Sequence, residues 1–359
     1  MKTTLKAAAL FTGLLILLTS FAACTTGSGA ATAPTTTATS EPDSSATEEA
    51  TTAAVATDDT PLRVAVLNGT TGFGIAPLYR DLSEGKVDDL NLTIDFYTDA
   101  TLVSPLIISG TADVAAVPTN LASVLYNKTN GGIRVLAVNT LGVLYLIENG
   151  ETVHCLADLS GKTVYLPGQG TNPEYVFRAL LRASGGAELE SSVTFDYSYP
   201  SPDELTTAAA TGKASLAVLP EPKVTAATMK NASLRVAVDF TDEWKKATGT
   251  ELVQGCVIVR SEYADAHPGI IEKFMQRYEG SVTKAASDID GAANDIVFAG
   301  IAPKEQLVKN ALPKCNLVFL TGKTMEDSLS AFWGALYNII PSSVGGKLPD
   351  GGIFQKISE

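Results

Sequence analysis

From position 61 onward, short runs of β-branched and other apolar residues alternate with longer stretches in which apolar and polar positions recur at helical spacing. This alternation predicts strands followed by helices, and therefore an α/β fold with largely parallel sheets. The first series predicts strands at 63–67, 92–97, 114–117 and 133–138, with helices at 76–82, 102–108 and 121–126.

A second series of the same kind follows Asp158. The body from position 61 onward has about 300 residues, which exceeds the size at which a single core keeps growing, so we expect two lobes. The second series predicts strands at 163–166, 193–197, 215–219 and 234–238, and helices at 174–183, 204–210 and 224–229.

Two further apolar, extended stretches lie at 143–147 and 252–259, between the series and after the second one. We interpret them as crossings between the lobes, which would form a two-segment hinge. After the second crossing only helical patterns remain, at 269–286, 304–310 and 326–340. The expected boundaries are 61–144 for the first part of lobe 1, 145–254 for lobe 2 and 255–359 for the return to lobe 1.

The first 23 residues have the features of a secretion signal. Lys2 and Lys6 precede an apolar run at 7–18, and small residues precede Cys24. The run is shorter than the about 20 residues that span a bilayer, so we predict a cleaved signal peptide at 1–23. The leader resembles that of bacterial lipoproteins, although Phe21 stands where Leu is usual, and this resemblance implies lipidation of Cys24. The alternative is an ordinary secreted protein in which Cys24 is a free thiol.

Residues 24–60 are almost entirely Thr, Ala, Ser, Gly and acidic residues, without an aromatic side chain. Such a segment buries too little apolar surface to offset the entropy lost on ordering, so we predict a disordered linker. With a lipid on Cys24, this linker would tether the body to the outer face of the cell membrane.

The acidic charge and the cysteine count exclude several classes of protein. The chain has a net charge of −13 and no basic patch with interleaved aromatic residues, which argues against nucleic-acid binding. The body has three cysteines, an odd number, which excludes a full disulfide framework. Two interpretations remain open: a bridge between Cys256 and Cys315, or three buried thiols that include Cys155.

Catalytic chemistry finds little support in the sequence. The two histidines are His154, beside Cys155, and His267, at a predicted helix start. No metal-ligand spacing, nucleophile elbow or Cys-x-x-Cys motif is present. We therefore expect no enzymatic activity, no metal and no cofactor.

The candidate binding residues lie in turns where a predicted strand leads into a helix. Ligands of open α/β sheets bind beyond the carboxyl ends of strands, where helix N-termini present free N–H groups. Two glycine-rich turns are the strongest candidates, because glycine lets the backbone approach a ligand closely. No Arg or Lys lies in them, so an anion would depend on N–H groups and hydroxyls, and a neutral heterocycle fits equally well. The first turn contains Asn68, Thr70, Thr71, Gly72, Phe73 as an exposed aromatic residue, and Gly74; the second contains Gly168, Gln169, Gly170, Thr171 and Asn172.

Five further residues complete the candidate set: Thr98, Thr119, Asn120, Tyr145 and Glu221. Structural roles compete with binding at several positions. Thr171 with Glu174, and Ser201 with Glu204, have the spacing of capping boxes, and any single tyrosine is explained equally well by core packing.

Several stretches together carry a family resemblance over nearly the whole body. These stretches are Val-Ala-Val-Leu-Asn-Gly-Thr-Thr-Gly at 64–72, Gly-Thr-Ala-Asp-Val-Ala-Ala-Val-Pro-Thr-Asn at 110–120, Asp-Leu-Ser-Gly-Lys-Thr-Val at 158–164, Thr-Asn-Pro-Glu-Tyr at 171–175, Gly-Lys-Ala-Ser-Leu-Ala-Val-Leu-Pro-Glu-Pro at 212–222 and Pro-Ser-Ser-Val-Gly-Gly-Lys-Leu-Pro at 341–349. With them, the chain resembles the extracytoplasmic solute-binding proteins of ABC transporters, close to the group for nitrate, sulfonates, taurine and thiamine precursors.

The resemblance implies a two-lobed periplasmic-binding-protein fold of type II, with two mixed sheets flanked by helices. It implies a monomer that captures a small molecule, either a sulfonate-like or nitrate-like anion or a heterocyclic thiamine precursor, and delivers it to a permease with a separate ATPase. A related fold serves in pyrimidine synthesis, but through a cysteine and histidine constellation that is missing here. The alternative is a ligand sensor that docks on a membrane receptor or kinase without transport.

Overall fold

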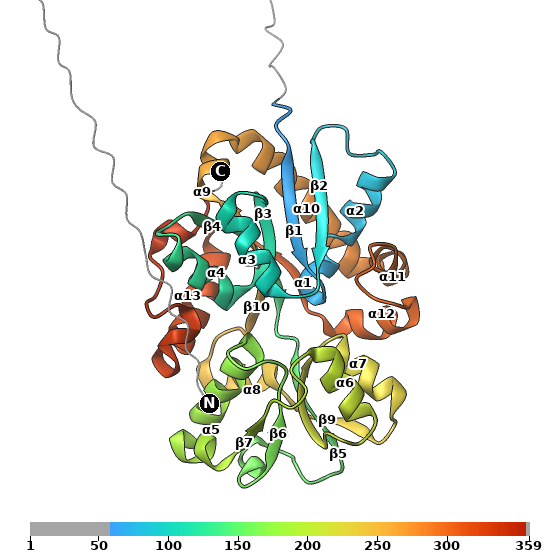
Figure 1. Cartoon of the computed structure of the whole chain (residues 1–359), viewed down its shortest axis with the longest axis vertical. Coiled ribbons are helices and arrows are strands. Elements are labelled where there is room, and N and C mark those ends of the chain that lie inside the picture. Colours follow the sequence, from blue (N-terminus) through green and yellow to red (C-terminus); the bar gives the residue numbers. More distant parts are fainter. Residues whose placement is uncertain (1–57, 357–359) are drawn as a thin grey trace, which may run out of the picture. The chain divides into compact units, whose positions relative to one another are not determined.

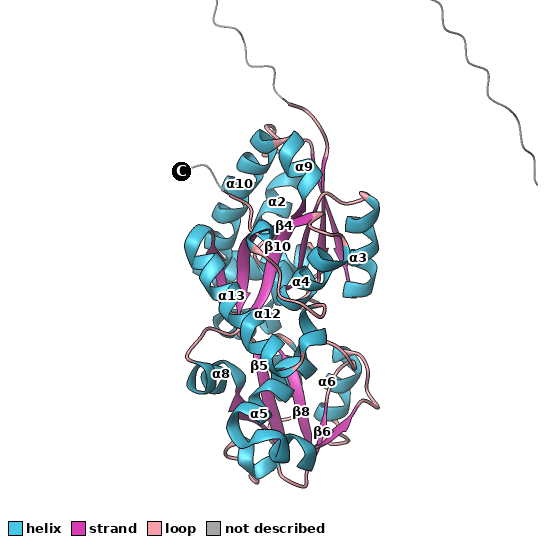
Figure 2. Cartoon of the chain, turned by 90° about the vertical axis from the view of Figure 1, so that its left-hand side faces the viewer, coloured by secondary structure: helices cyan, strands magenta, loops and turns pink. Residues whose placement is uncertain are grey.

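The structure is a computed structural model that describes residues 58–356. The expected signal peptide, Cys24 and nearly all of the expected linker lie outside the described residues. Within them, the chain forms two sheets, each flanked by helices (Figure 2). The middle of the chain, coloured green to yellow in Figure 1, builds one lobe, whereas segments from both ends build the other. The predicted two-lobed α/β fold with two mixed sheets is confirmed.

The larger sheet has six strands in the order β11-β4-β10-β3-β1-β2. β1 is parallel to β2 and β3, while β10 is antiparallel to β3 and β4. The strands are β1 (Leu62–Leu67), β2 (Leu92–Tyr97), β3 (Val114–Pro118), β4 (Ile133–Leu141), β10 (Val253–Arg260) and β11 (Leu317–Leu320). The helices of this lobe are α1 (Thr70–Phe73), α2 (Ala76–Ser83), α3 (Ala100–Ser109), α4 (Thr119–Lys128), α9 (Ser261–Ala266), α10 (Pro268–Ser287), α11 (Ile289–Phe298), α12 (Glu305–Ala311) and α13 (Gly322–Ile339).

The smaller sheet has five strands in the order β7-β6-β8-β5-β9. β6 is parallel to β7 and β8, and β5 is antiparallel to β8 and β9. The strands are β5 (Leu144–Asn149), β6 (Thr163–Tyr165), β7 (Thr194–Asp196), β8 (Leu216–Pro220) and β9 (Leu234–Asp239), and the helices are α5 (Asn172–Ser192), α6 (Pro202–Ala210), α7 (Lys223–Lys230) and α8 (Phe240–Thr248).

The crossings between the sheets are shorter than the sequence indicated. The chain leaves β4 and enters β5 through Gly142 and Val143, and it returns from α8 to β10 through 249–252. Most residues of the two stretches that we interpreted as crossings instead form strands inside the two sheets. Both stretches are buried apolar runs, so their backbone N–H and C=O groups need neighbouring strands on both sides as hydrogen-bond partners. β5 finds them in β8 and β9, and β10 finds them in β3 and β4.

The expectation of only helical segments after the second crossing is wrong, because β11 pairs antiparallel with β4. β11 is a four-residue edge strand of half-buried apolar residues, without the alternation that marks a one-sided strand. Four helices, α1, α8, α9 and α11, were also missing from the prediction.

An apolar core continues from one lobe into the other. Trp244 of α8 packs on Phe332 of α13 with ring centroids 5.3 Å apart. Beside them, Arg182 Nη1 of α5 donates a 2.9 Å hydrogen bond to the carbonyl of Ile339 at the end of α13. Side chains of α5, α8 and α13 therefore hold the two lobes together, in addition to the two crossings.

The cysteines of the described residues are free thiols. Cys256 and Cys315 are buried in separate clusters, so no bridge joins them. Cys155 is exposed, which also corrects the alternative of three buried thiols. Burial raises the pKa of the Cys315 thiol, whose Sγ lies 3.2 Å from the carbonyl of Ala311.

Candidate functional site

The strand register brings the turns singled out from the sequence to two sheet edges. In the larger sheet, the start of β10 lies beside the ends of β3 and β4, since Gly255 pairs with Pro118 and Thr140. In the smaller sheet, the start of β5 lies beside the ends of β8 and β9, since Leu144 pairs with Pro220 and Tyr145 with Asp239. The first crossing directly joins these two edges, which we call the facing edges.

The first glycine-rich turn forms a short helix, α1, instead of an open loop. A Cβ on Gly72 would come 2.8 Å from the carbonyl oxygen of Leu67, and one on Gly74 would come 2.9 Å from Val282 Cγ2. Both glycines therefore allow α1 to pack against β1 and α10. They do not provide a close approach to a ligand.

Phe73 is not the exposed aromatic residue that the sequence led us to expect. It is 0 % exposed and belongs to a core cluster with Ala76, Ala285 and Ile296. Because α1 is helical, its fourth residue turns inward toward helices α2, α10 and α11. Asn68, Thr70 and Thr71 remain as the polar residues of this turn, with Thr70 largely buried.

Thr119 and Asn120 act inside the protein. The Thr119 hydroxyl donates a 2.6 Å hydrogen bond to the carbonyl of Val253, and its own carbonyl accepts from Trp333 Nε1 at 3.0 Å. Asn120 Nδ2 donates to the carbonyl of Ser343 at 3.4 Å. These residues tie the start of α4 to the start of β10, to α13 and to the C-terminal segment, whereas Thr98 is exposed just after β2.

The second glycine-rich turn keeps an open conformation at the N-terminus of α5. Gly168 and Gly170 have φ values of 68° and 73°, which other residues rarely adopt. Gln169 and Thr171 are exposed, and Asn172 is buried. Of the residues that we predicted to line a ligand in this turn, Gln169 and Thr171 are therefore accessible to solvent.

The capping box predicted for Thr171 and Glu174 does not form. The Thr171 hydroxyl turns back to donate to the carbonyl of Gly168 at 2.8 Å, and Glu174 accepts the backbone N–H of Gly170 at 2.5 Å. The corresponding prediction for α6 is confirmed: Ser201 Oγ accepts the Glu204 N–H at 3.1 Å, and the Glu204 carboxylate accepts the Ser201 N–H at 3.2 Å.

The Glu174 carboxylate holds the second glycine-rich turn in its conformation. Burial tends to raise the pKa of this carboxyl, but the Gly170 N–H and the Arg178 guanidinium outweigh burial and hold the pKa below its ordinary value. Arg178 Nε lies 2.7 Å from the Glu174 carboxylate. The ion pair of Glu174 and Arg178 therefore holds the turn, although the spacing of Thr171 and Glu174 in the sequence had indicated a helix cap.

Tyr145 and Glu221 meet a residue of the other lobe that the sequence did not single out. The Tyr145 hydroxyl donates to the carbonyl of Lys314 at 3.4 Å, and Lys314 Nζ lies 3.9 Å from the Glu221 carboxylate. Glu221 is 1 % exposed and also accepts from the N–H and hydroxyl of Thr225. Burial raises the pKa of both Tyr145 and Glu221.

Unpartnered polar atoms gather at the facing edges. Six buried side-chain oxygen or nitrogen atoms of the described residues lack a hydrogen-bond partner, and five of them lie here, where strands end or helices begin. Two of these residues, Thr241 and Gln254, carry no motif that sequence reasoning could have recognised. The five atoms are Asn68 Oδ1, Asn172 Oδ1, Tyr197 OH, Thr241 Oγ1 and Gln254 Nε2.

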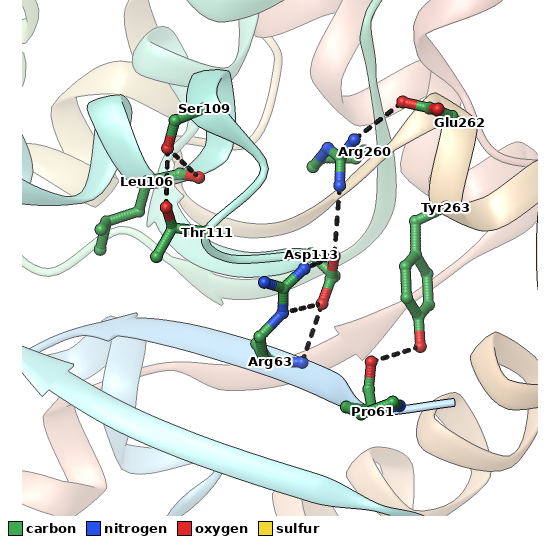
Figure 3. A network of polar contacts seen from close by, with 9 residues as sticks. All are labelled: Pro61, Arg63, Leu106, Ser109, Thr111, Asp113, Arg260, Glu262 and Tyr263. Carbon is green, nitrogen blue, oxygen red and sulfur yellow. Dashed lines mark hydrogen bonds and ion pairs between the residues drawn. The ribbon is translucent and has the colours of Figure 1, made fainter. Parts of the chain in front are cut away.

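A hollow of about 370 Å³ at the opposite end of the larger sheet has a different character. Its floor is the buried Asp113 carboxylate, which accepts from Arg63 Nε and Nη2 at 2.8 Å each and from Arg260 Nη1 at 3.3 Å (Figure 3). Arg260 also pairs with Glu262 at 2.8 Å. Because these charges satisfy one another, the network serves to join the start of β1 to the end of β10.

Neither a metal centre nor a membrane span is present among the residues 58–356. No three His, Cys, Asp or Glu side chains there are grouped to hold a metal ion. No helix in the same range is long and apolar enough to pass through a bilayer.

Comparison with known proteins gives a family match and a set of similar folds. The model of the family described as NMT1/THI5 like matches residues 75–292, more than half of the chain. No curated protein matches the sequence.

Three solved structures illustrate the similarity in fold. An ABC transporter protein from Parabacteroides distasonis is 23% identical, with a TM-score of 0.70 over 84% of this chain and 100% of that one. The periplasmic aliphatic sulphonate binding protein SsuA from Escherichia coli is 14% identical, with a TM-score of 0.64 over 80% and 94%. The alkanesulfonate-binding protein SsuA from Xanthomonas axonopodis pv. citri, bound to MOPS, is 16% identical, with a TM-score of 0.60 over 81% and 94%.

Proposed function

This chain belongs to the NMT1/THI5-like family, and from that membership we propose that it is the solute-binding component of an ABC importer. It captures a small molecule between its lobes and delivers it, without chemical turnover, to a membrane permease driven by a separate ATPase. Similarity in fold to proteins that bind sulfonates supports this role.

The observation that carries the proposal is the set of five unpartnered polar atoms at the facing edges. A buried polar atom without a partner costs about 1–3 kcal/mol, and native proteins retain few of them. Ligands of open α/β sheets bind beyond the carboxyl ends of strands, which is where these atoms lie. A bound solute would supply their missing partners.

We place the solute between the two turns at Asn68, Thr70 and Thr71 and at 168–172, with Thr98, Tyr145 and Glu221 at the margins. Phe73 and its two neighbouring glycines are excluded, because they pack inside lobe 1. Thr119 and Asn120 shape the edge through their bonds to the start of β10 and the C-terminal segment.

Closure of the lobes is the proposed mechanism. The two short crossings act as the hinge, and a solute that contacts both facing edges favours the closed arrangement by its higher affinity for that state. The permease then recognises the closed form. We further propose that the protein is a monomer, that Cys24 carries a lipid, and that the linker at 24–60 keeps the body at high effective concentration near its permease.

A binding screen of the mature protein tests the proposal. Thermal-shift and titration calorimetry measurements would compare sulfonates, nitrate and aminopyrimidine thiamine precursors. A true solute at about 100 times its Kd stabilises the folded protein by about 2.7 kcal/mol. Small-angle scattering should show a smaller radius of gyration with that solute. If no class of solute stabilises the protein and its radius of gyration stays constant, the proposal is wrong.

A further inference from the structure

We propose that the carboxamides of Asn172 and Gln254 select an uncharged solute that presents a hydrogen-bond donor and an acceptor side by side. Carboxamides, lactams and aminopyrimidines have this arrangement. The inference rests on the proposed function, since it names the ligand class of the same site. It predicts that sulfonates and nitrate are not the preferred solutes.

The two residues come from different lobes and meet at the facing edges. Asn172 is the first residue of α5, and Gln254 is the second residue of β10, next to the crossing at 249–252. Each is 7 % exposed. Asn172 Nδ2 donates a 2.9 Å hydrogen bond to Gln254 Oε1. Asn172 Oδ1 and Gln254 Nε2 are left buried without partners.

The unpartnered atoms of this pair define which hydrogen-bonding groups a solute must offer. A carboxamide has one acceptor oxygen and one donor nitrogen, and a bond between two carboxamides uses one of each. If both groups turn over, Gln254 donates to Asn172, and the free atoms become Asn172 Nδ2 and Gln254 Oε1. In either orientation one donor and one acceptor remain. A complementary solute must therefore offer both an acceptor and a donor.

An inorganic or organic anion does not meet this requirement. Nitrate and a sulfonate group carry acceptor oxygens and no donor, so the free carboxamide oxygen would stay unpaired and would face negative charge. Asn68 Oδ1 is a further unpartnered atom at these edges. Its carboxamide can likewise serve a ligand that carries N–H groups.

The cationic side chains near the facing edges are already engaged with acids. Lys314 lies 3.9 Å from the buried carboxylate of Glu221, and Lys223 at the start of α7 pairs with Asp203. Arg178, nearly two turns into α5, is held between the carboxylates of Glu174 and Glu190. These pairings leave the carboxamides as the groups that recognise the solute.

The pair also couples recognition to closure. Because Asn172 and Gln254 belong to different lobes, a solute that bonds to both free atoms adds to the bond that already joins them. Such a solute has a higher affinity for the state in which the two side chains meet, and it shifts the population toward that state.

Calorimetry on the mature protein tests the inference with two sets of probes. Nicotinamide, pyrrolidone and cytosine each offer a donor beside an acceptor, whereas ethanesulfonate and nitrate offer only acceptors. We expect the first set to contain the tighter ligand. Gln254→Glu keeps the size and the acceptor of residue 254 but removes its donor, so it should weaken that ligand about tenfold or more, a change of about 1.4 kcal/mol. Gln276→Glu, which makes the same exchange at an exposed glutamine on α10, is the matched control and should leave affinity unchanged.

A second variant keeps the test valid if Gln254→Glu does not fold. Asn172→Asp keeps the shape of residue 172 but removes the donor that bonds to Gln254 Oε1. The Gln254 N–H groups then turn toward the new carboxylate and no longer serve the solute, so the neutral ligand should also bind more weakly, with thermal unfolding measured in parallel. Tighter binding of ethanesulfonate or nitrate, with unaltered affinity in both variants, would overturn the ligand class and leave the proposed function intact. If no probe of either set binds and the radius of gyration never changes, the proposed function fails as well.

Discussion

Replacement of Phe73 by Ala distinguishes a core residue from a ligand contact. The ring is 0 % exposed and lies among small side chains, including Ala76, Ala285 and Ala292, which are themselves fully buried. These alanines sit on three different helices, so the helices would have to move together to fill the space left by the ring. We expect the cavity to persist.

The magnitude follows from the buried area. A phenylalanine buries about 150–200 Å², and at about 25 cal/mol per Å² the ring accounts for about 4–5 kcal/mol. Measured Phe→Ala exchanges in cores cost about 3–5 kcal/mol, which agrees with this value. We therefore predict that Phe73→Ala lowers the free energy of unfolding by about 4 kcal/mol.

Urea unfolding followed by circular dichroism measures this loss as a lower midpoint with an unchanged slope. The matched control is Phe298→Ala on α11. Phe298 is 46 % exposed, and the Arg80 guanidinium lies 3.5 Å from its ring centroid, so we expect a loss of about 1 kcal/mol. Equal and small losses in the two variants, together with weaker solute binding by Phe73→Ala, would refute the core assignment and restore Phe73 to the site.

Three further predictions concern the cap, the crossing and the second turn. Ser201→Ala removes the acceptor for an N–H of α6 and should cost about 1 kcal/mol in thermal unfolding, while Ser201→Thr should cost much less; equal losses would contradict the cap. Gly142→Ala places a methyl group against the side chain of Thr241, 2.9 Å from its Cγ2, and should cost about 1–3 kcal/mol, with partial recovery when Thr241→Ala is added. A neutral effect of Gly142→Ala would mean that the crossing is not tightly packed. For Glu174, the folded-state pKa lies below the ordinary value of 4.5, so its carboxylate stabilises the fold above that pH and loses this effect as the pH falls through the folded-state pKa. The stability difference between the wild type and Glu174→Gln should therefore shrink on acidification below about pH 4.5, and a difference that widens would contradict the assignment.

Much of the fold was predictable because its strands have strong local signals. β2 was predicted with its observed bounds, and β1 and β3 within one residue. β1 and β3 are short, mainly apolar runs, β2 alternates apolar and polar residues, and each strand is followed by a turn and a helix. β11 escaped prediction because its pairing with β4 depends on residues far apart in the chain. The bounds of the two crossings could not be predicted for the same reason, because only the strands that pair with β5 and β10 decide where each crossing ends and each strand begins.

The candidate site was predictable in position and less so in composition. Strand order places the turns at a common edge, so 168–172 and Asn68 could be selected from the sequence. Gly72 and Gly74 could not be told apart from ligand-facing glycines, because a glycine required by close packing and one required by a ligand look identical in a sequence. Gln254 and Lys314 have no local signal, since their importance comes from Asn172 and Glu221 on the other lobe.

The sequence by itself determined the alternation of strands and helices, the division into two lobes, the acidic charge and the family. These properties depend on composition and on the spacing of neighbouring residues. Only the tertiary structure decided that Phe73 is core, that Thr119 bonds to the start of β10, and that Asn172 meets Gln254 with one donor and one acceptor left free. Those outcomes depend on side chains from distant segments, whose hydrogen bonds and contacts exist only when the two sheets come together.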